Sequence, residues 1–254
     1  MIEVQGTFNR LANPTRFLAL AGAVLPWLTG LTVVLLLVGL YLAFFVAPAD
    51  YQQGQTVKIM FIHVPSAWIA MMGYSVIAVA SVGSLIWRHP MADVAAKAAA
   101  PIGACFTLMA LVTGSLWGKP MWGTYWVWDA RLTSMLVLLF LYLGYMALLE
   151  AFDDPARGVK ASSILVLAGA INIPIIKFSV DWWNTLHQTA SVFKRGGPSI
   201  DPAMLWPLFL MALSFTTYYV WVLLMRIRAE IIGRKIRALR MRQTRAGFKG
   251  AKAG

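Results

Sequence analysis

The sequence has almost no cysteine and few charged side chains. Of its 254 residues only one is a cysteine, Cys105, and it lies within an apolar stretch. A single thiol cannot form a disulfide, a CxxC redox pair or a cysteine-based metal site within one chain, which disfavours thiol chemistry. Charged residues make up 13% of the chain and hydrophobic residues 59%, with a mean hydropathy of +0.69. Such a composition is too apolar to maintain a soluble surface and predicts a protein embedded in lipid.

Motifs for nucleotide hydrolysis and zinc binding are also missing. The chain has no Walker motif, so we do not expect it to hydrolyse ATP by itself. Its three histidines form neither an HExxH sequence nor a closely spaced His/Cys set. The segment Met1 to Pro26 lacks the short apolar core and small-residue cleavage site of a secretory signal, so we interpret the chain as unprocessed.

Six stretches are apolar and long enough to cross a bilayer as helices, which takes about 20 residues each. We expect these spans at Pro26 to Val46, Ile59 to Trp87, Val94 to Trp117, Leu132 to Ala151, Ala161 to Val180 and Met204 to Met225. The sequence therefore predicts an all-α integral membrane protein, a bundle of six transmembrane helices in a single domain. Residues 1–25 form its N-terminal segment, 26–225 the bundle with a tryptophan-rich loop at 117–131, and 226–254 a basic tail.

The distribution of lysine and arginine predicts the orientation of this bundle. With the N-terminus inside, sixteen basic residues fall in inside segments and five in outside loops, and Lys177 remains within the fifth span. The positive-inside rule then places both termini in the cytoplasm, with the basic tail dominating this prediction. The loops 47–58, 118–131 and 181–203 would then lie on the extracytoplasmic side, and we expect the functional chemistry there.

The net charge of +12 could indicate a nucleic-acid partner, but most of it lies in the tail and in short loops beside apolar runs. We therefore expect membrane lipid, and no nucleic acid, as its counterpart. The simpler interpretation of the tail is an anchor on anionic lipid, where each basic residue near the surface contributes about 1 kcal/mol. A docking site for a cytoplasmic subunit is the alternative.

Tryptophan is concentrated in the second of these outer loops. Isolated tryptophans at a membrane boundary usually form an interfacial belt, which explains Trp27, Trp68, Trp87, Trp206 and Trp221. A belt does not explain four of the 11 tryptophans within twelve residues: Trp117, Trp122, Trp126 and Trp128. As a helix lying in the interface, this segment would place Trp122, Trp126 and Asp129 on one face. Such a platform suits a large, flat, apolar ligand.

Two of the histidines belong to the same predicted face. His63 lies at the outer end of the second span and His187 in the third outer loop, whereas His89 lies in an inner turn and is interpreted as an ordinary polar residue. Imidazole is the commonest protein ligand for haem and for many metals. Two distant histidines beside an aromatic wall favour haem b (iron protoporphyrin IX) over a bare cation.

Haem carries two propionates, and these need cationic partners when they leave water. Arginine binds carboxylates through two parallel hydrogen bonds, which makes Arg131 the natural candidate, with Lys119, Lys194 and Arg195 in nearby loops. Alternatively, Arg131 pairs with Asp129 or reaches the lipid headgroups. Lys177 and Asp181 are four residues apart in the fifth span and are expected to form a pair.

Three stretches of the sequence resemble a known family. WGTYWVWDARLTS, from Trp122 to Ser134, resembles the tryptophan-rich signature of haem-handling membrane proteins in cytochrome c maturation. IMFIHVPSAW around His63 and FSVDWWNTLHQ leading to His187 resemble the haem exporter protein C family, the CcmC subunits of the bacterial System I pathway. The resemblance covers roughly Met60 to Gln188 and agrees in having six spans.

The resemblance implies a role for each motif. His63 and His187 are expected to be the two axial ligands of haem at the periplasmic surface of the inner membrane. A platform made by Trp122, Trp126, Trp128 and Asp129 is expected to meet the haem edge and the periplasmic haem chaperone CcmE. The implied activity is haem binding and presentation rather than enzyme catalysis. The implied partners are the ATPase subunit CcmA, the membrane subunit CcmB and the small single-span subunit CcmD of an ABC-type complex.

Two other functions remain open from the residues. A b-type membrane cytochrome for electron transfer would bury paired histidines inside the bundle, whereas here both are predicted at one surface. A small-molecule permease would require ionisable residues or broken helices at mid-membrane, and the sequence offers only Lys177, near one end of a span.

Overall fold

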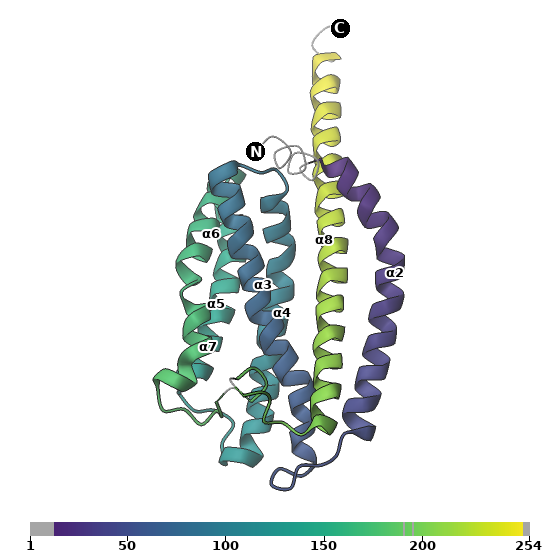
Figure 1. Ribbon diagram of the computed structural model, residues 1–254. Coiled ribbons are helices and arrows are strands. Elements are labelled where there is room, and N and C mark those ends of the chain that lie inside the picture. The colour runs from purple at the N-terminus through teal and green to yellow at the C-terminus, as the bar shows by residue number, and fades with distance from the viewer. Residues whose placement is uncertain (1–12, 190, 195, 251–254) are drawn as a thin grey trace.

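The computed structural model describes residues 13–189, 191–194 and 196–250, and within them all helices and turns form one bundle (Figure 1). The helices in chain order are α2 (Pro14–Tyr41), α3 (Met60–Trp87), α4 (Ala92–Trp122), α5 (Ala130–Glu150), α6 (Pro155–Gly169), α7 (Asn172–Trp182) and α8 (Pro202–Gly250). A π-helical turn, η1 (Leu42–Val46), follows α2, and a 3-10 helix, η2 (Gln55–Ile59), precedes α3.

Six helical segments are long and apolar enough to cross a membrane, which confirms the predicted number of spans. They are Pro14–Val46, Gln55–Trp87, Ala92–Trp122, Ala130–Glu150, Pro155–Trp182 and Pro202–Thr244. The first begins earlier than predicted, because Asn13 caps it by accepting hydrogen bonds from the backbone N–H groups of Thr15 and Arg16. Pro26 then lies inside α2 instead of starting it.

The fifth span is broken into α6 and α7, which the sequence analysis did not predict. Ala170 donates its N–H to Leu167 at 3.3 Å, so the carbonyl of Val166 loses its usual helical partner. The Tyr74 hydroxyl, from α3, donates to that carbonyl at 3.1 Å. Asn172 begins α7 and donates its side-chain amide to the carbonyl of Ser134 at 2.9 Å. Neighbouring helices therefore satisfy the polar groups at the break, as an apolar surrounding requires.

Helix α3 holds the centre of the bundle. It packs against α4, α6 and α8, whereas α2 packs mainly against α8 at one side (Figure 1). Tyr142 on α5 is fully buried and donates its hydroxyl to the carbonyl of Ala70 at 2.7 Å. Its ring passes so close to Gly103 on α4 that a Cβ at that position would overlap it. A glycine therefore allows α4 and α5 to approach closely around this tyrosine.

The predicted basic tail continues α8 as one helix that extends past the rest of the bundle (Figure 1). Where it leaves the bundle, its charges pair with α4: Arg234 lies 2.8 Å from Asp93 and 2.9 Å from Glu230 of its own helix. Lys97 on α4 lies 3.5 Å from the same Glu230. These pairs attach α8 to α4 at the end of the bundle where α2 begins.

Candidate functional site

A cavity of about 340 Å³ lies at the end of the bundle opposite the basic tail. Its wall comes from the first half of α3, the second half of α4, the start of α5 and the end of α7. Residues 186–189 and 191–193, between α7 and α8, complete it. Ligand pockets usually enclose about 300–1,000 Å³, so this cavity lies at the small end of that range.

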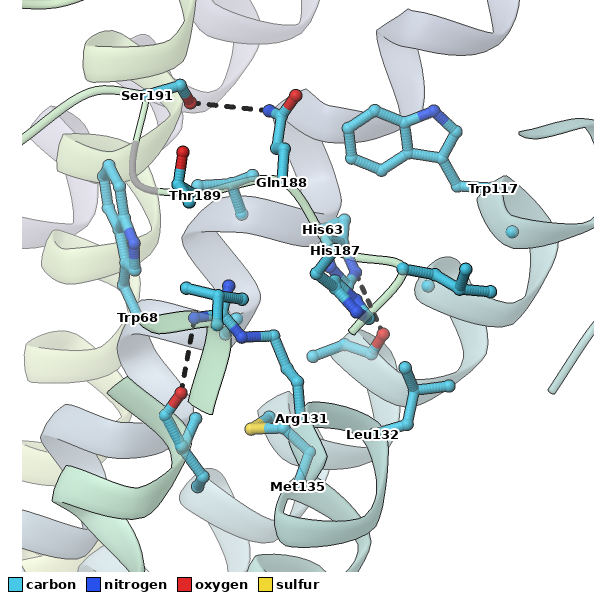
Figure 2. Close-up of a pocket in the computed structure, with 18 of the residues that line it drawn as sticks. His63, Trp68, Trp117, Arg131, Leu132, Met135, His187, Gln188, Thr189 and Ser191 are labelled. Atoms are coloured by element: carbon cyan, nitrogen blue, oxygen red, sulfur yellow. Dashed lines mark hydrogen bonds between the residues drawn. The ribbon is translucent and has the colours of Figure 1, made fainter. Parts of the chain in front are cut away.

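His63 lies in the first turns of α3 with its ring against α4 (Figure 2). Its Nδ1 is 3.0 Å from the carbonyl oxygen of Ala110 and 3.2 Å from Oγ1 of Thr113. Because a carbonyl oxygen can only accept, Nδ1 carries the proton and Nε2 does not. Gly114 allows this approach, since a Cβ there would stand 2.9 Å from Cε1 of His63. Helix α4 thus fixes the orientation and the tautomer of this imidazole.

His187 is held by Asp129, the N-cap residue of α5. One carboxylate oxygen of Asp129 accepts the backbone N–H of Leu132 at 2.8 Å, which caps the helix. The other lies 3.3 Å from Nδ1 of His187. The side chain of Asp129 is only 4% exposed, so this contact is shielded from water. Nδ1–H of His187 therefore donates to the carboxylate, and Nε2 is again the unprotonated nitrogen.

Both imidazoles have features that a metal ligand requires. Burial lowers the pKa of His187 from its usual 6.5, although the neighbouring Asp129 carboxylate acts in the opposite direction. A neutral ring is the form that ligates metals. Both histidines line the cavity, and Nε2 of neither has a hydrogen-bond partner within the described part of the chain. Fixing a ligand through its second ring nitrogen is the usual arrangement around protein-bound metals.

Two of the four predicted tryptophans stand beside these histidines. Trp117 meets the His63 ring edge-on at 5.8 Å between centroids and donates Nε1–H to Oε1 of Gln53 at 2.9 Å. Trp122 meets the His187 ring at 4.9 Å. Trp117, Trp122 and both histidines line the cavity. Gln53 lines it too and was not anticipated from the sequence.

The predicted helix lying in the interface is wrong. Helix α4 ends at Trp122, because Gly123 adopts a left-handed conformation with φ of +76° that terminates the helix. The chain then runs without helix until Asp129 caps α5. Trp122, Trp126 and Asp129 therefore do not share one helical face: Asp129 contacts His187, and Trp126 lies outside the cavity wall.

Trp126 and Trp128 form a second aromatic pair next to the cavity. Their rings meet edge-on with centroids 5.4 Å apart. Trp128 is 75% exposed, whereas Nε1 of Trp126 is buried without a hydrogen-bond partner in the described residues. The tryptophan cluster is thus divided between a pair that lines the cavity and a pair at its outside.

Trp68 was interpreted as a belt residue, and that interpretation is wrong. It lines the cavity (Figure 2). Its ring lies 5.5 Å from that of Phe193, in the segment that completes the wall. Trp27, Trp87 and Trp206 are 82%, 64% and 71% exposed, which agrees with a belt. No sequence signal separates Trp68 from these, because the difference is the direction in which each ring leaves its helix.

Arg131, in the first turn of α5, lines the cavity and connects α5 to α7 (Figure 2). Its Nε donates to Oγ of Ser179 at 3.2 Å, and its Nη2 donates to the carbonyls of Ile176 and Lys177, each at 3.3 Å. Within the described residues it forms no ion pair with Asp129, so that alternative is not supported. Its Nη1 has no hydrogen-bond partner there and remains available to a ligand.

The other basic residues considered for propionates lie elsewhere. Lys119 donates to the carbonyl of Gly123 at 2.9 Å and stands 5.2 Å above the ring of Tyr125. Neither Lys119 nor Lys194 lines the cavity, and Arg195 lies outside the described residues.

Lys177 and Asp181 on α7 do line the cavity, although the sequence analysis considered them only as a pair. The described residues show no ion pair between them. Asp181 instead interacts electrostatically with Arg131, whereas Lys177 has no ion-pair partner in the described residues.

The donor set fits haem better than a bare metal ion. No three His, Cys, Asp or Glu side chains that could hold a metal ion come together in the described ranges. A bare ion such as zinc requires at least that number of protein ligands, whereas in haem the porphyrin supplies four nitrogens and leaves two axial positions. Two oriented histidines could supply both axial ligands, so the residues present fit haem.

Comparison with known proteins identifies relatives along most of the chain. The family described as Heme exporter protein C matches residues 7–242. Heme exporter protein C of Bradyrhizobium diazoefficiens is 63% identical over 237 residues, covering 93% of this chain and 90% of the relative. Heme exporter protein C of Escherichia coli K12 is 51% identical over 226 residues, covering 89% and 91%. A putative cytochrome c biosynthesis ccmC-like mitochondrial protein of Marchantia polymorpha is 52% identical over 176 residues, covering 69% and 74%.

Proposed function

Because this chain belongs to the heme exporter protein C family, whose members are multi-pass inner-membrane proteins that handle haem in cytochrome c biogenesis, we propose that its cavity binds haem b between His63 and His187. The two imidazoles supply the axial ligands through Nε2. Trp117 and Trp122 form the adjoining aromatic wall. The protein acts as a carrier and presenter of haem and is not itself an enzyme.

The observation that carries this proposal is the matched arrangement of the two histidines. Each uses Nδ1–H for a fixed acceptor, the Ala110 carbonyl for His63 and the Asp129 carboxylate for His187. Each therefore offers the unprotonated Nε2 to the same cavity. An ordinary polar histidine at a membrane boundary has no need of a tautomer fixed in this way.

The orientation of the bundle follows from its charges. Both termini lie in the cytoplasm, because the basic residues of the α8 extension favour that side. The cavity, at the other end of the bundle, then opens to the periplasm. Haem held there is accessible to a periplasmic protein but is still surrounded by the ends of the helices.

The receiving protein is the haem chaperone CcmE. Trp128, which is largely exposed beside the cavity, and its neighbour Trp126 provide the aromatic surface that CcmE contacts at the haem edge. The complex that releases the loaded chaperone contains the ATPase subunit CcmA, the membrane subunit CcmB and the single-span subunit CcmD. The absence of a Walker motif in this chain is consistent with a separate ATPase subunit.

The two rival functions fit the structure less well. A b-type cytochrome would bury the haem between helices, whereas here one ligand lies on a segment between helices at the end of the bundle. A permease would use broken helices along its path, and the fifth span is indeed broken. However, the break at Ala170 and Ile171 does not line the cavity.

The test is an absorption spectrum of the purified full-length protein, oxidised and reduced, for the wild type and three variants. We expect a bis-histidine haem spectrum in the wild type that is lost in His63→Ala and in His187→Ala. His89→Ala is the matched control, because His89 lies between α3 and α4 at the opposite end of the bundle and should retain haem. Normal haem content in both cavity variants would refute the ligand assignment.

A further inference from the structure

Lys177 is a charged residue that the sites described so far do not use. It lies in α7, five residues before that helix ends at Trp182, and it lines the cavity. Its side chain has no hydrogen bond and no ion pair in the described residues. Ionisable residues within membrane-spanning segments are rare and often mark the path or the site of a ligand.

A second cation stands on the same wall. Nη2 of Arg131 donates to the backbone carbonyl of Lys177 at 3.3 Å, so its guanidinium lies against the helix turn that carries the lysine. The same guanidinium keeps Nη1 without a partner. Arg131 and Lys177 are thus two cationic residues on the cavity wall where α5 meets α7. The third charged side chain on the cavity wall, Asp181, is negative and lies one helical turn beyond Lys177.

We propose that Lys177 and Arg131 together form a carboxylate-binding wall that recognises the two propionates of the bound porphyrin. This inference rests on the proposed function, and it names the part of the ligand that the wall binds. Both propionates extend from one edge of the porphyrin, so two adjacent cations can neutralise both. The arginine offers a planar fork and the lysine a compact charge.

The assignment also fixes how haem lies in the cavity. The carboxylate edge faces α5 and α7, and the edge without carboxylates faces away from them. Asp181 carries a negative charge on the same wall, so it repels carboxylates and weakens the binding of haem. Removing its charge should therefore strengthen the binding of haem.

The test compares two probes, iron protoporphyrin IX and its dimethyl ester, in which both carboxylates are neutral. Each is titrated by absorption into the full-length protein in lipid nanodiscs. We expect the wild type to bind the ester about tenfold or more weakly, because charge-assisted hydrogen bonds to the carboxylates are lost. Lys177→Met should weaken the binding of haem but not of the ester, so the ratio of the two affinities should become smaller than in the wild type. Lys177→Arg should restore the preference.

Two further variants make the test specific. Asp181→Asn should increase the affinity for haem and leave that for the ester unchanged. Lys58→Met is the matched control, because Lys58 donates to the Phe44 carbonyl outside the cavity and should keep the wild-type preference. If the wild type bound both probes equally, or if Lys177→Met lost affinity for both to the same extent, the carboxylate wall would be overturned. The assignment of the histidine ligands would be unaffected. A wild type that binds neither probe would overturn the proposed function as well.

Discussion

Asp129 offers the sharpest test of the site, because its two carboxylate oxygens have separate tasks. One caps α5 through the N–H of Leu132, and the other holds Nδ1 of His187. Asp129→Asn keeps the cap, since asparagine is as good a helix-capping residue as aspartate. Its amide group, however, would direct a donor at the Nδ1–H donor of His187. The imidazole must then rotate or change tautomer, and Nε2 is no longer held for the iron.

The expected magnitude follows from this geometry. Loss of the group that orients a metal-ligating histidine typically weakens metal binding by about 10- to 100-fold, which corresponds to about 1.4–2.8 kcal/mol. The stability of the fold should change by much less, because the cap is retained. Asp129→Ala would remove the cap too and add a destabilisation of about 1 kcal/mol.

The assay is haem titration by absorption, combined with thermal unfolding of the same apoprotein samples. Asp154→Asn is the matched control: Asp154 caps α6 by accepting the N–H of Ala156 at 3.0 Å, away from the cavity. Both variants should unfold near the wild-type temperature, and only Asp129→Asn should lose haem affinity. If Asp129→Asn bound haem with wild-type affinity and spectrum, the orienting role of Asp129 would be refuted.

Three further predictions test neighbouring features. Gly114→Ala should displace the His63 ring and reduce the haem content of the purified protein. Gly22→Ala is the control, because nothing lies within 4 Å of a Cβ added there. Equal haem content in the two variants would contradict the close contact between Gly114 and His63. Trp128→Ala should keep haem content but slow loading of CcmE in a reconstituted transfer assay, and unimpaired loading would remove this residue from the chaperone surface. Because burial lowers the pKa of His187 below 6.5, its Nε2 stays unprotonated at neutral pH, so haem affinity should be flat above pH 7 and fall only as the pH drops through that lowered pKa. A fall in affinity already between pH 8 and pH 7 would show that another group controls binding.

Hydropathy predicted the six spans because the need to bury a helix backbone in lipid acts on each segment separately. The break in the fifth span was not predictable in this way. It depends on Tyr74, which lies far away in sequence and satisfies the carbonyl of Val166 where α6 ends. The hydropathy of the segment is the same with or without that partner.

Residue types and their order along the chain were enough to single out His63, His187, the tryptophan cluster and Arg131 as candidates, because few polar or aromatic groups gather at one predicted face. They could not show which of these side chains meet. Helical spacing put Trp122, Trp126 and Asp129 on one face, but Gly123 ends α4 and directs Asp129 inward to His187.

The sequence by itself thus determined the class of protein, the number of spans and the chemical elements of the site, since these follow from composition and local pattern. Only the tertiary structure decided that both histidines present Nε2 to one cavity, that Trp68 and Gln53 belong to its wall, and that Lys177 stands beside Arg131 without a partner of its own. The physical reason is that the tautomer of an imidazole and the pairing of a charge are set by groups brought close by helix packing, and the spacing of residues along one chain does not specify that packing.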